Sequence, residues 1–212
     1  MTDKALNPIS AQCPRRSSLT LPLALALVLP LALLTGCSSA KKTDPYAPAS
    51  EAARDTQRAV ALNNEALPYM DKGDLSSMNR AEELLRQALS ADLYFGPAHN
   101  NLGVIYLQEG KYYEAAGEFE WARRLLPGHP DPRVNLAMTL ESAGRSDEAI
   151  ATYRTALEVY PEYVAAMQGL ARLQLKSGKA DEKTAWLLKE VALKGETPEW
   201  RDWARGELTR VR

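Results

Sequence analysis

The sequence predicts an all-α fold built from stacked helix–turn–helix pairs. Two observations predict it: the same residue types recur at a spacing of 34 along the chain, and apolar residues recur at helical spacing within each block. The recurring residues are Leu102, Gly103, Tyr106, Gly110, Ala115, Phe119, Ala122 and Pro127, answered by Leu136, Ala137, Leu140, Gly144, Ala149, Tyr153, Ala156 and Pro161. Such repetition argues against an ordinary enzyme fold with one core.

Each slot of the repeat has a physical reason. Leu102 and Tyr106 lie on one face of a first helix, which Gly110 is expected to end. Phe119 lies on the inner face of a second helix, where it fills the gap that the small residues of both helices leave. Pro127 closes the second helix, because proline cannot continue its hydrogen-bond ladder.

Together these residues resemble the tetratricopeptide repeat, with residues 96–129 and 130–163 as two full units. The resemblance implies a right-handed solenoid of three to four helix–turn–helix repeats over residues 51–195, followed by a C-terminal capping helix. The four units are expected near residues 59–95, 96–129, 130–163 and 164–195.

The first unit departs from the pattern. Ala81, Leu85 and Ala88 precede their counterparts by 34 residues, which predicts a second helix over residues 77–91. The first helix is expected near residues 51–72, and the glycine that ends it, Gly73, lies three residues before the position that the 34-residue period predicts. We therefore expect a longer turn over residues 73–79.

The last unit and the C-terminal segment also depart from it. Lys183 falls where a packed alanine belongs, so the helix over residues 181–194 is expected to shift register or to pack differently. Thr197 and Pro198 open a final helix within residues 196–212, as an N-cap and a proline at the first helical position. Its tryptophans Trp200 and Trp203 indicate a cap over the last repeat, with a partner- or membrane-binding helix as the alternative.

Residues 1–36 have the pattern of a signal peptide. Two arginines precede an apolar run over residues 19–34 that contains Pro22 and Pro30. As a helix this run would rise only about 24 Å, which is short for a membrane span.

The run ends in Leu34-Thr35-Gly36-Cys37, which resembles the lipobox of bacterial lipoproteins. The resemblance implies cleavage before Cys37 and its modification by fatty acids such as palmitate; a plain secretory signal is the alternative. Residues 37–50 would then be the lipidated cysteine and a flexible tether. Ser38 after the cysteine favours the outer membrane, so we expect a lipid-anchored protein of the bacterial cell envelope that faces the periplasm.

The sequence offers no catalytic or metal-binding pattern. The two histidines, His99 and His129, lack a second ligand at a metal-binding spacing. We expect His99 to be a packed helix residue and His129 to be a solvated turn residue. Carboxylates such as Glu118 are expected on solvated helix surfaces. No phosphate-binding or nucleophile motif is present, and the net charge of −1 gives no nucleic-acid signature. We therefore expect no enzyme, no cofactor, no small-molecule substrate and no nucleic-acid partner.

The resemblance also implies a concave groove, lined by the first helices, that receives a protein or peptide partner. The residues expected there are Asn63, Asn64, Asn100, Asn101, Val104, Gln108, Val134, Asn135, Met138, Gln168 and Arg172. Asn64, Asn101 and Asn135 occupy one slot in successive units, similar to the asparagine ladder of the O-linked N-acetylglucosamine transferase superhelix. We expect these amides to face solvent and to grip a peptide backbone, although asparagine is also common in this slot of the repeat.

Two functions fit these features. The first is a membrane-tethered adaptor or scaffold lipoprotein whose groove recruits envelope proteins. The second is a structural assembly subunit resembling a type IV pilus or secretin pilotin. The family's carboxylate clamp needs Lys and Arg where this chain has Ala165 and Gly169, so recognition of a C-terminal carboxylate by that device is not expected.

Overall fold

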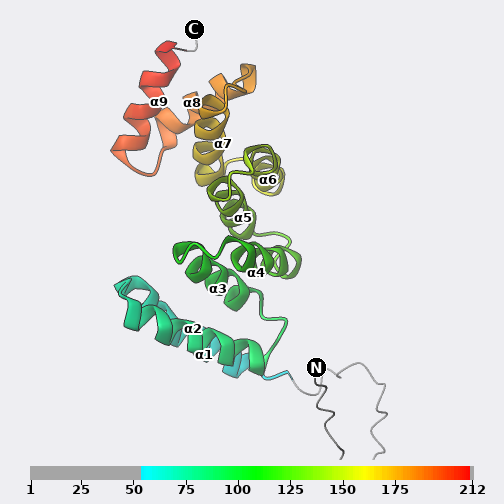
Figure 1. The fold of residues 1–212 in the computed structure, drawn as a ribbon. Helices are drawn as coiled ribbons and strands as arrows, with labels where there is room; N and C mark the ends of the chain where they lie inside the picture. Colours follow the sequence, from blue (N-terminus) through cyan, green and yellow to red (C-terminus); the bar gives the residue numbers. More distant parts are fainter. Residues whose placement is uncertain (1–53, 211–212) are drawn as a thin grey trace, which may run out of the picture. The chain divides into compact units, whose positions relative to one another are not determined.

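The computed structural model describes residues 54–210, and within that range every regular element is an α-helix (Figure 1). This confirms the predicted all-α class. The helices are α1 (Thr56–Lys72), α2 (Leu75–Ala91), α3 (Gly96–Gln108), α4 (Tyr112–Leu125), α5 (Asp131–Ser142), α6 (Ser146–Val159), α7 (Val164–Lys176), α8 (Glu182–Lys194) and α9 (Pro198–Arg210). The predicted signal peptide, Cys37 and the tether lie outside the described residues.

The helices pack as consecutive pairs. α1 lies against α2, α3 against α4, α5 against α6, and α7 against α8 (Figure 1). Each second helix also contacts the first helix of the next pair, and α9 packs on α8. The arrangement is the predicted solenoid, with four pairs and a capping helix in the described range. None of these helices is both long enough and apolar enough to cross a membrane.

The turn inside each pair depends on a glycine with positive φ. Gly73, Gly110, Gly144 and Gly178 have φ of 68°, 74°, 77° and 67°. A side chain at such an angle would crowd the backbone, so glycine is the natural residue there. At Gly110 the N–H of the next residue, Lys111, donates to the Tyr106 carbonyl at 2.8 Å. The same bond recurs after Gly144 and Gly178, so one Schellman-type turn reverses the chain in three successive repeats.

The core contains the small residues and rings that the pattern predicts. Ala115, Phe119 and Ala149 have no exposed surface, and Tyr153 is 1% exposed. A Cβ added to Gly103 would lie 2.7 Å from the Phe119 ring, so only glycine fits beside it. The two helices of this unit therefore approach as closely as the missing side chain allows.

The expectation of a longer turn over residues 73–79 is wrong. The turn consists of Gly73 and Asp74 alone, because α2 already begins at Leu75. The Asp74 carboxylate caps this helix by accepting a hydrogen bond from the N–H of Ser77 at 3.0 Å. The three extra residues lengthen α2, which has 17 residues where α4 has 14.

The register shift expected in the last unit is confirmed. In α8 the fully buried residues are Thr184, Leu188 and Val191, each one position later than the alanine and ring slots of the preceding repeats. Lys183 is exposed. The extra residue lies before α8, where Asp181 and Thr184 form a capping box that fixes the new start of the helix.

The final helix begins as predicted. Thr197 accepts from the N–H of Trp200 at 3.5 Å, and Pro198 is the first helical residue. Ala204 is fully buried, while Trp200 and Trp203 pack against the core with their rings edge to face at 5.2 Å. The apolar stripe of α9 thus covers the last repeat.

The start of α1 is tied to the turn between α2 and α3. Asp92, 5% exposed, accepts a hydrogen bond from the Thr56 hydroxyl at 2.7 Å and lies 3.5 Å from the Arg54 guanidinium. The N–H of Asp55 donates to the Ala91 carbonyl at 2.9 Å. The first described residues are therefore attached to the end of α2 as well as to their own helix.

His99 is a packed helix residue, as expected, but the solvated position expected for Glu118 is wrong. The His99 ring is 4% exposed and stacks on Trp121 at 5.7 Å. Its Nδ1 lies 2.6 Å from the Glu118 carboxylate and its Nε2 lies 2.8 Å from the Leu93 carbonyl. Both ring nitrogens thus have an acceptor within hydrogen-bonding distance. Glu118 therefore joins α4 to α3.

We expect Ala149→Leu to lower the free energy of unfolding by about 1–3 kcal/mol, because the added methylenes have no space at a fully buried position between helices. The matched control is Ala151→Leu, which makes the same change at an exposed position of α6 and should have little effect. Urea unfolding followed by circular dichroism measures both. Equal tolerance of the two substitutions would contradict the packing described above.

We expect Glu118→Gln to lower the free energy of unfolding by about 1–2 kcal/mol, because it removes the charge from the acceptor of a buried imidazole. Glu158→Gln changes an exposed carboxylate on α6 and is the control. Thermal melts of the two variants give the comparison. No difference between them would mean that Glu118 is an ordinary surface residue.

Candidate protein-binding groove

The first helices of the four pairs contact one another in series: α1 with α3, α3 with α5, and α5 with α7. Asparagine amides join the first two of these junctions. Asn101 Nδ2 donates to Asn63 Oδ1 at 2.9 Å, and Asn135 Nδ2 donates to Asn100 Oδ1 at 3.0 Å. Each bond runs from one repeat back to the repeat before it.

This pairing explains why asparagines occur in consecutive positions. Asn101 donates to the repeat before it, and its neighbour Asn100 accepts from the repeat after it, so two adjacent asparagines connect one unit to both of its neighbours. From the sequence we expected these amides to face solvent, whereas in the structure they bond to one another. The signal was present: two adjacent asparagines in one unit and their counterparts in the next.

The paired amides retain unused hydrogen-bonding groups. An amide has two N–H donors and an oxygen that can accept twice. Within residues 54–210, Asn101 and Asn135 each donate one side-chain hydrogen bond and accept none. Both are only partly buried, so part of each side chain is accessible to a partner. The interhelical bonds hold the amides in fixed positions, about one repeat apart.

The third junction is ionic. Both terminal nitrogens of Arg172 on α7 donate to Glu141 on α5, at 2.9 and 2.7 Å. Lys176 lies 3.8 Å from the same carboxylate, which is 11% exposed. Burial raises the pKa of the nearby Tyr153 hydroxyl to about 12, so this phenol is neutral at physiological pH. Arg172 is therefore held by Glu141 and is less available to a partner than its sequence position suggested.

The predicted groove residues differ in accessibility. Asn64, Gln108 and Met138 are exposed. The partly exposed members are Asn100, Asn101, Val104, Asn135 and Arg172. Asn63, Val134 and Gln168 are buried, at 6%, 5% and 4% exposure. The surface open to a partner is formed by the first two groups.

The structure also shows why the carboxylate-clamp position is small. A Cβ added to Gly169 would lie 2.4 Å from the Tyr153 ring, so Lys or Arg cannot replace this glycine without displacing the ring. The ring crosses from α6 to the following repeat, and it therefore excludes a longer residue. Among the described residues, no group of three or more His, Cys, Asp or Glu side chains could hold a metal ion.

Comparison with known proteins gives the same class of protein. A family model described as the protein kinase G tetratricopeptide repeat matches residues 41–196. The chain is 31% identical over 103 residues to the TPR repeat-containing thioredoxin TTL4 of Arabidopsis thaliana, an alignment that covers 49% of this chain and 14% of that protein. The chain thus spans only a small part of this relative.

Solved structures share the fold. The first TPR of Spaghetti (RPAP3) bound to the HSP90 peptide SRMEEVD superposes with a TM-score of 0.55 at 19% identity, covering 59% of this chain and 98% of that one. The crystal structure of MamA gives a TM-score of 0.56 at 22% identity, covering 64% and 77%. Because the family model matches most of the sequence, the chain belongs to the tetratricopeptide repeat family. The matched family is a repeat and not an enzyme family, and proteins of this kind act by binding other proteins.

Proposed function

We infer that this protein is a membrane-tethered adaptor of the bacterial cell envelope, and that its groove binds an extended peptide segment of a partner protein. The observation that carries the proposal is the position of Asn101 and Asn135, each held by a hydrogen bond that it donates to the preceding repeat and each with an unused donor and acceptor.

Such amides suit a peptide backbone. A backbone offers one N–H donor and one carbonyl acceptor per residue, whatever its side chains, and an amide can match both. Because the side chains of Asn101 and Asn135 are already ordered, they lose little conformational entropy when a peptide binds. The exposed Met138, three residues after Asn135 on α5, supplies an adaptable apolar contact. The first TPR of Spaghetti (RPAP3), which has the same fold, is bound to an HSP90 peptide in its solved structure, and this supports a peptide partner here.

The membrane part of the proposal rests on the sequence Leu34-Thr35-Gly36-Cys37. Two or more acyl chains, at about 0.8 kcal/mol per buried methylene, would hold the protein on a membrane stably. The chain from Cys37 to Arg54 could reach at most about 60 Å when fully extended. Ser38 leads us to place the anchor in the outer membrane, with the repeats in the periplasm.

The partner can be identified by photocrosslinking in intact membranes. A photoreactive amino acid at Gln108 or Met138 should capture segments of envelope proteins, whereas the same group at Tyr113 on α4, which is 91% exposed, should not. Mass spectrometry then identifies the captured segment. Several clients support an adaptor, and a single ring-forming client supports the pilotin-like alternative. Capture from Tyr113 alone would contradict the groove assignment.

We expect the double substitution Asn101→Ala with Asn135→Ala to weaken binding of the captured segment by roughly 1–3 kcal/mol, because about two backbone hydrogen bonds are lost. Stability should also fall, by about 0.5–1.5 kcal/mol for each interhelical bond removed. Calorimetric titration with a synthetic copy of the segment measures affinity, and thermal melting measures stability. Arg124→Gln, an exposed change on α4, is the control. Unchanged affinity in a folded double variant would show that these amides only join the helices.

We expect Cys37→Ala to abolish lipid attachment and to leave an uncleaved precursor, because the thiol is the proposed site of modification. Metabolic labelling with a fatty acid tests this, and Cys13→Ala, which changes the other cysteine, is the control. Incorporation of label into the Cys37→Ala variant would contradict the anchor.

A further inference from the structure

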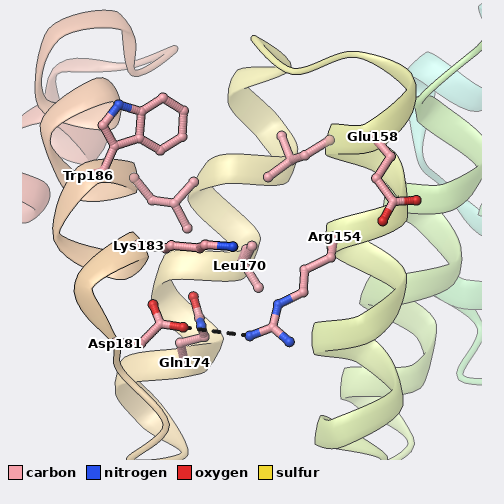
Figure 2. Close-up of a pocket in the computed structure, with 9 residues that line it drawn as sticks. Arg154, Glu158, Leu170, Gln174, Asp181, Lys183 and Trp186 are labelled. Carbon is pink, nitrogen blue, oxygen red and sulfur yellow. Dashed lines mark ion pairs between the residues drawn. The ribbon is translucent and has the colours of Figure 1, made fainter.

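A cavity of about 470 Å³ lies between α6, α7 and α8 and shares no residue with the asparagine groove (Figure 2). Leu157, Leu170 and Leu187 form its apolar surface, and Trp186, 48% exposed, stands at one side. Arg154 lies at the mouth, where its guanidinium is 3.8 Å from the carboxylate of Asp181, the N-cap of α8. The cavity has the size and the mixed lining of a binding site.

Gln174 at the floor of this cavity has an unsatisfied hydrogen-bond acceptor. The residue is 1% exposed, and its Oε1 has no partner within residues 54–210. Figure 2 shows its amide beside the ion pair of Arg154 with Asp181. A buried amide oxygen without a donor is unfavourable, so this atom indicates a ligand that can donate a hydrogen bond.

The repeats themselves show how this position can be satisfied. Gln174 and Arg154 occupy the slots of Tyr106 and Arg86 two repeats earlier. There the Arg86 guanidinium donates to the Tyr106 hydroxyl at 2.7 Å, and that hydroxyl donates to Glu82 at 3.2 Å. Burial raises the pKa of Tyr106 to about 12, so the phenol keeps its proton. At the later position the arginine is retained, but the phenol ring is absent.

The register shift of α8 adds to the space. The extra residue before α8 moves Thr184 into the alanine slot and leaves Lys183 at the side of the cavity. In the repeat before it, Leu140 occupies the slot of Gln174 and has no polar atom to satisfy. Only the last junction combines an arginine, an unsatisfied amide and a cavity among the described repeats.

We propose that this cavity binds a tyrosine side chain of a protein partner. The phenol oxygen accepts a hydrogen bond from Arg154, and its O–H donates to Gln174 Oε1. The ring packs on Leu170 and Leu187 beside the Trp186 indole. Because a hydroxyl both donates and accepts, it satisfies the amide in either orientation of its oxygen and nitrogen.

A protein source for the phenol is favoured by a second hollow. It is lined by Arg154, Asp181, Glu182 and Lys183 and therefore adjoins the cavity. It offers side chains of both charge signs, which can form hydrogen bonds with the main chain on either side of a tyrosine. A small free phenol would not extend into this hollow and would not contact these groups. The interaction is independent of the asparagine groove.

The test uses the full chain in detergent micelles, labelled with 5-fluorotryptophan. Its four tryptophans give four fluorine signals, and Trp186→Phe identifies the signal of Trp186. The probes are the capped tripeptides acetyl-Ala-Tyr-Ala-amide and acetyl-Ala-Phe-Ala-amide, which differ only in the hydroxyl. We expect the tyrosine peptide to shift the Trp186 signal saturably and to bind about tenfold more tightly than the phenylalanine peptide.

Two variants test the hydrogen bonds. Gln174→Leu copies the residue of the preceding repeat, and Arg154→Gln removes the guanidinium at an exposed position, with thermal melting as the check that both variants are folded. Each should reduce the preference for tyrosine to about twofold or less, whereas Arg124→Gln on α4 should leave it unchanged. Three results would overturn the proposal: no shift of the Trp186 signal, equal binding of both peptides, or an unchanged preference in Arg154→Gln. The first would mean that water alone occupies the cavity.

Discussion

The close approach of two helix backbones around an aromatic ring is the interaction on which the two central repeats depend. It requires a residue without a side chain facing the ring, and Gly103 beside Phe119 meets this condition. Gly169 beside Tyr153 meets it across the boundary between two repeats. The Phe119 ring packs the two helices of one pair, α3 and α4, against each other. The Tyr153 ring packs α6 against α7, the first helix of the next pair. The spacing of the first helices, and hence of the groove amides, follows from these contacts.

The polar residues have a double role within this packed frame. Asn101 and Asn135 join successive repeats with one N–H each, which leaves their remaining groups for a partner. Binding and stability are therefore coupled in the same side chains. Such coupling is compatible with a preorganised site, because an amide held by the solenoid is already positioned when a peptide arrives.

The repeat period predicted most of the fold because its slots describe local requirements. A glycine with positive φ at Gly144 and a small residue at Ala149 can be recognised from sequence alone. Changes in the length of an element were harder to predict, since three extra residues can extend either a loop or a helix. In this chain they extend α2, because Asp74 caps that helix at its earlier start. Partnerships across repeats were harder still. Glu118 faces His99 from 19 positions away, and no helical periodicity links the two.

The connection at Asp92 affects how a tethered protein would bear load. If the chain is anchored through its N-terminal segment, a pull arrives at Arg54 and Thr56, both of which contact Asp92 between α2 and α3. The force is then shared by α1 and the end of α2, and α1 is not peeled away one turn at a time. Hydrogen bonds and ion pairs that are loaded together resist a larger force than the same bonds broken one after another. Asp92 would thus distribute the load of the tether over several bonds, so that movements of the membrane disturb the groove less.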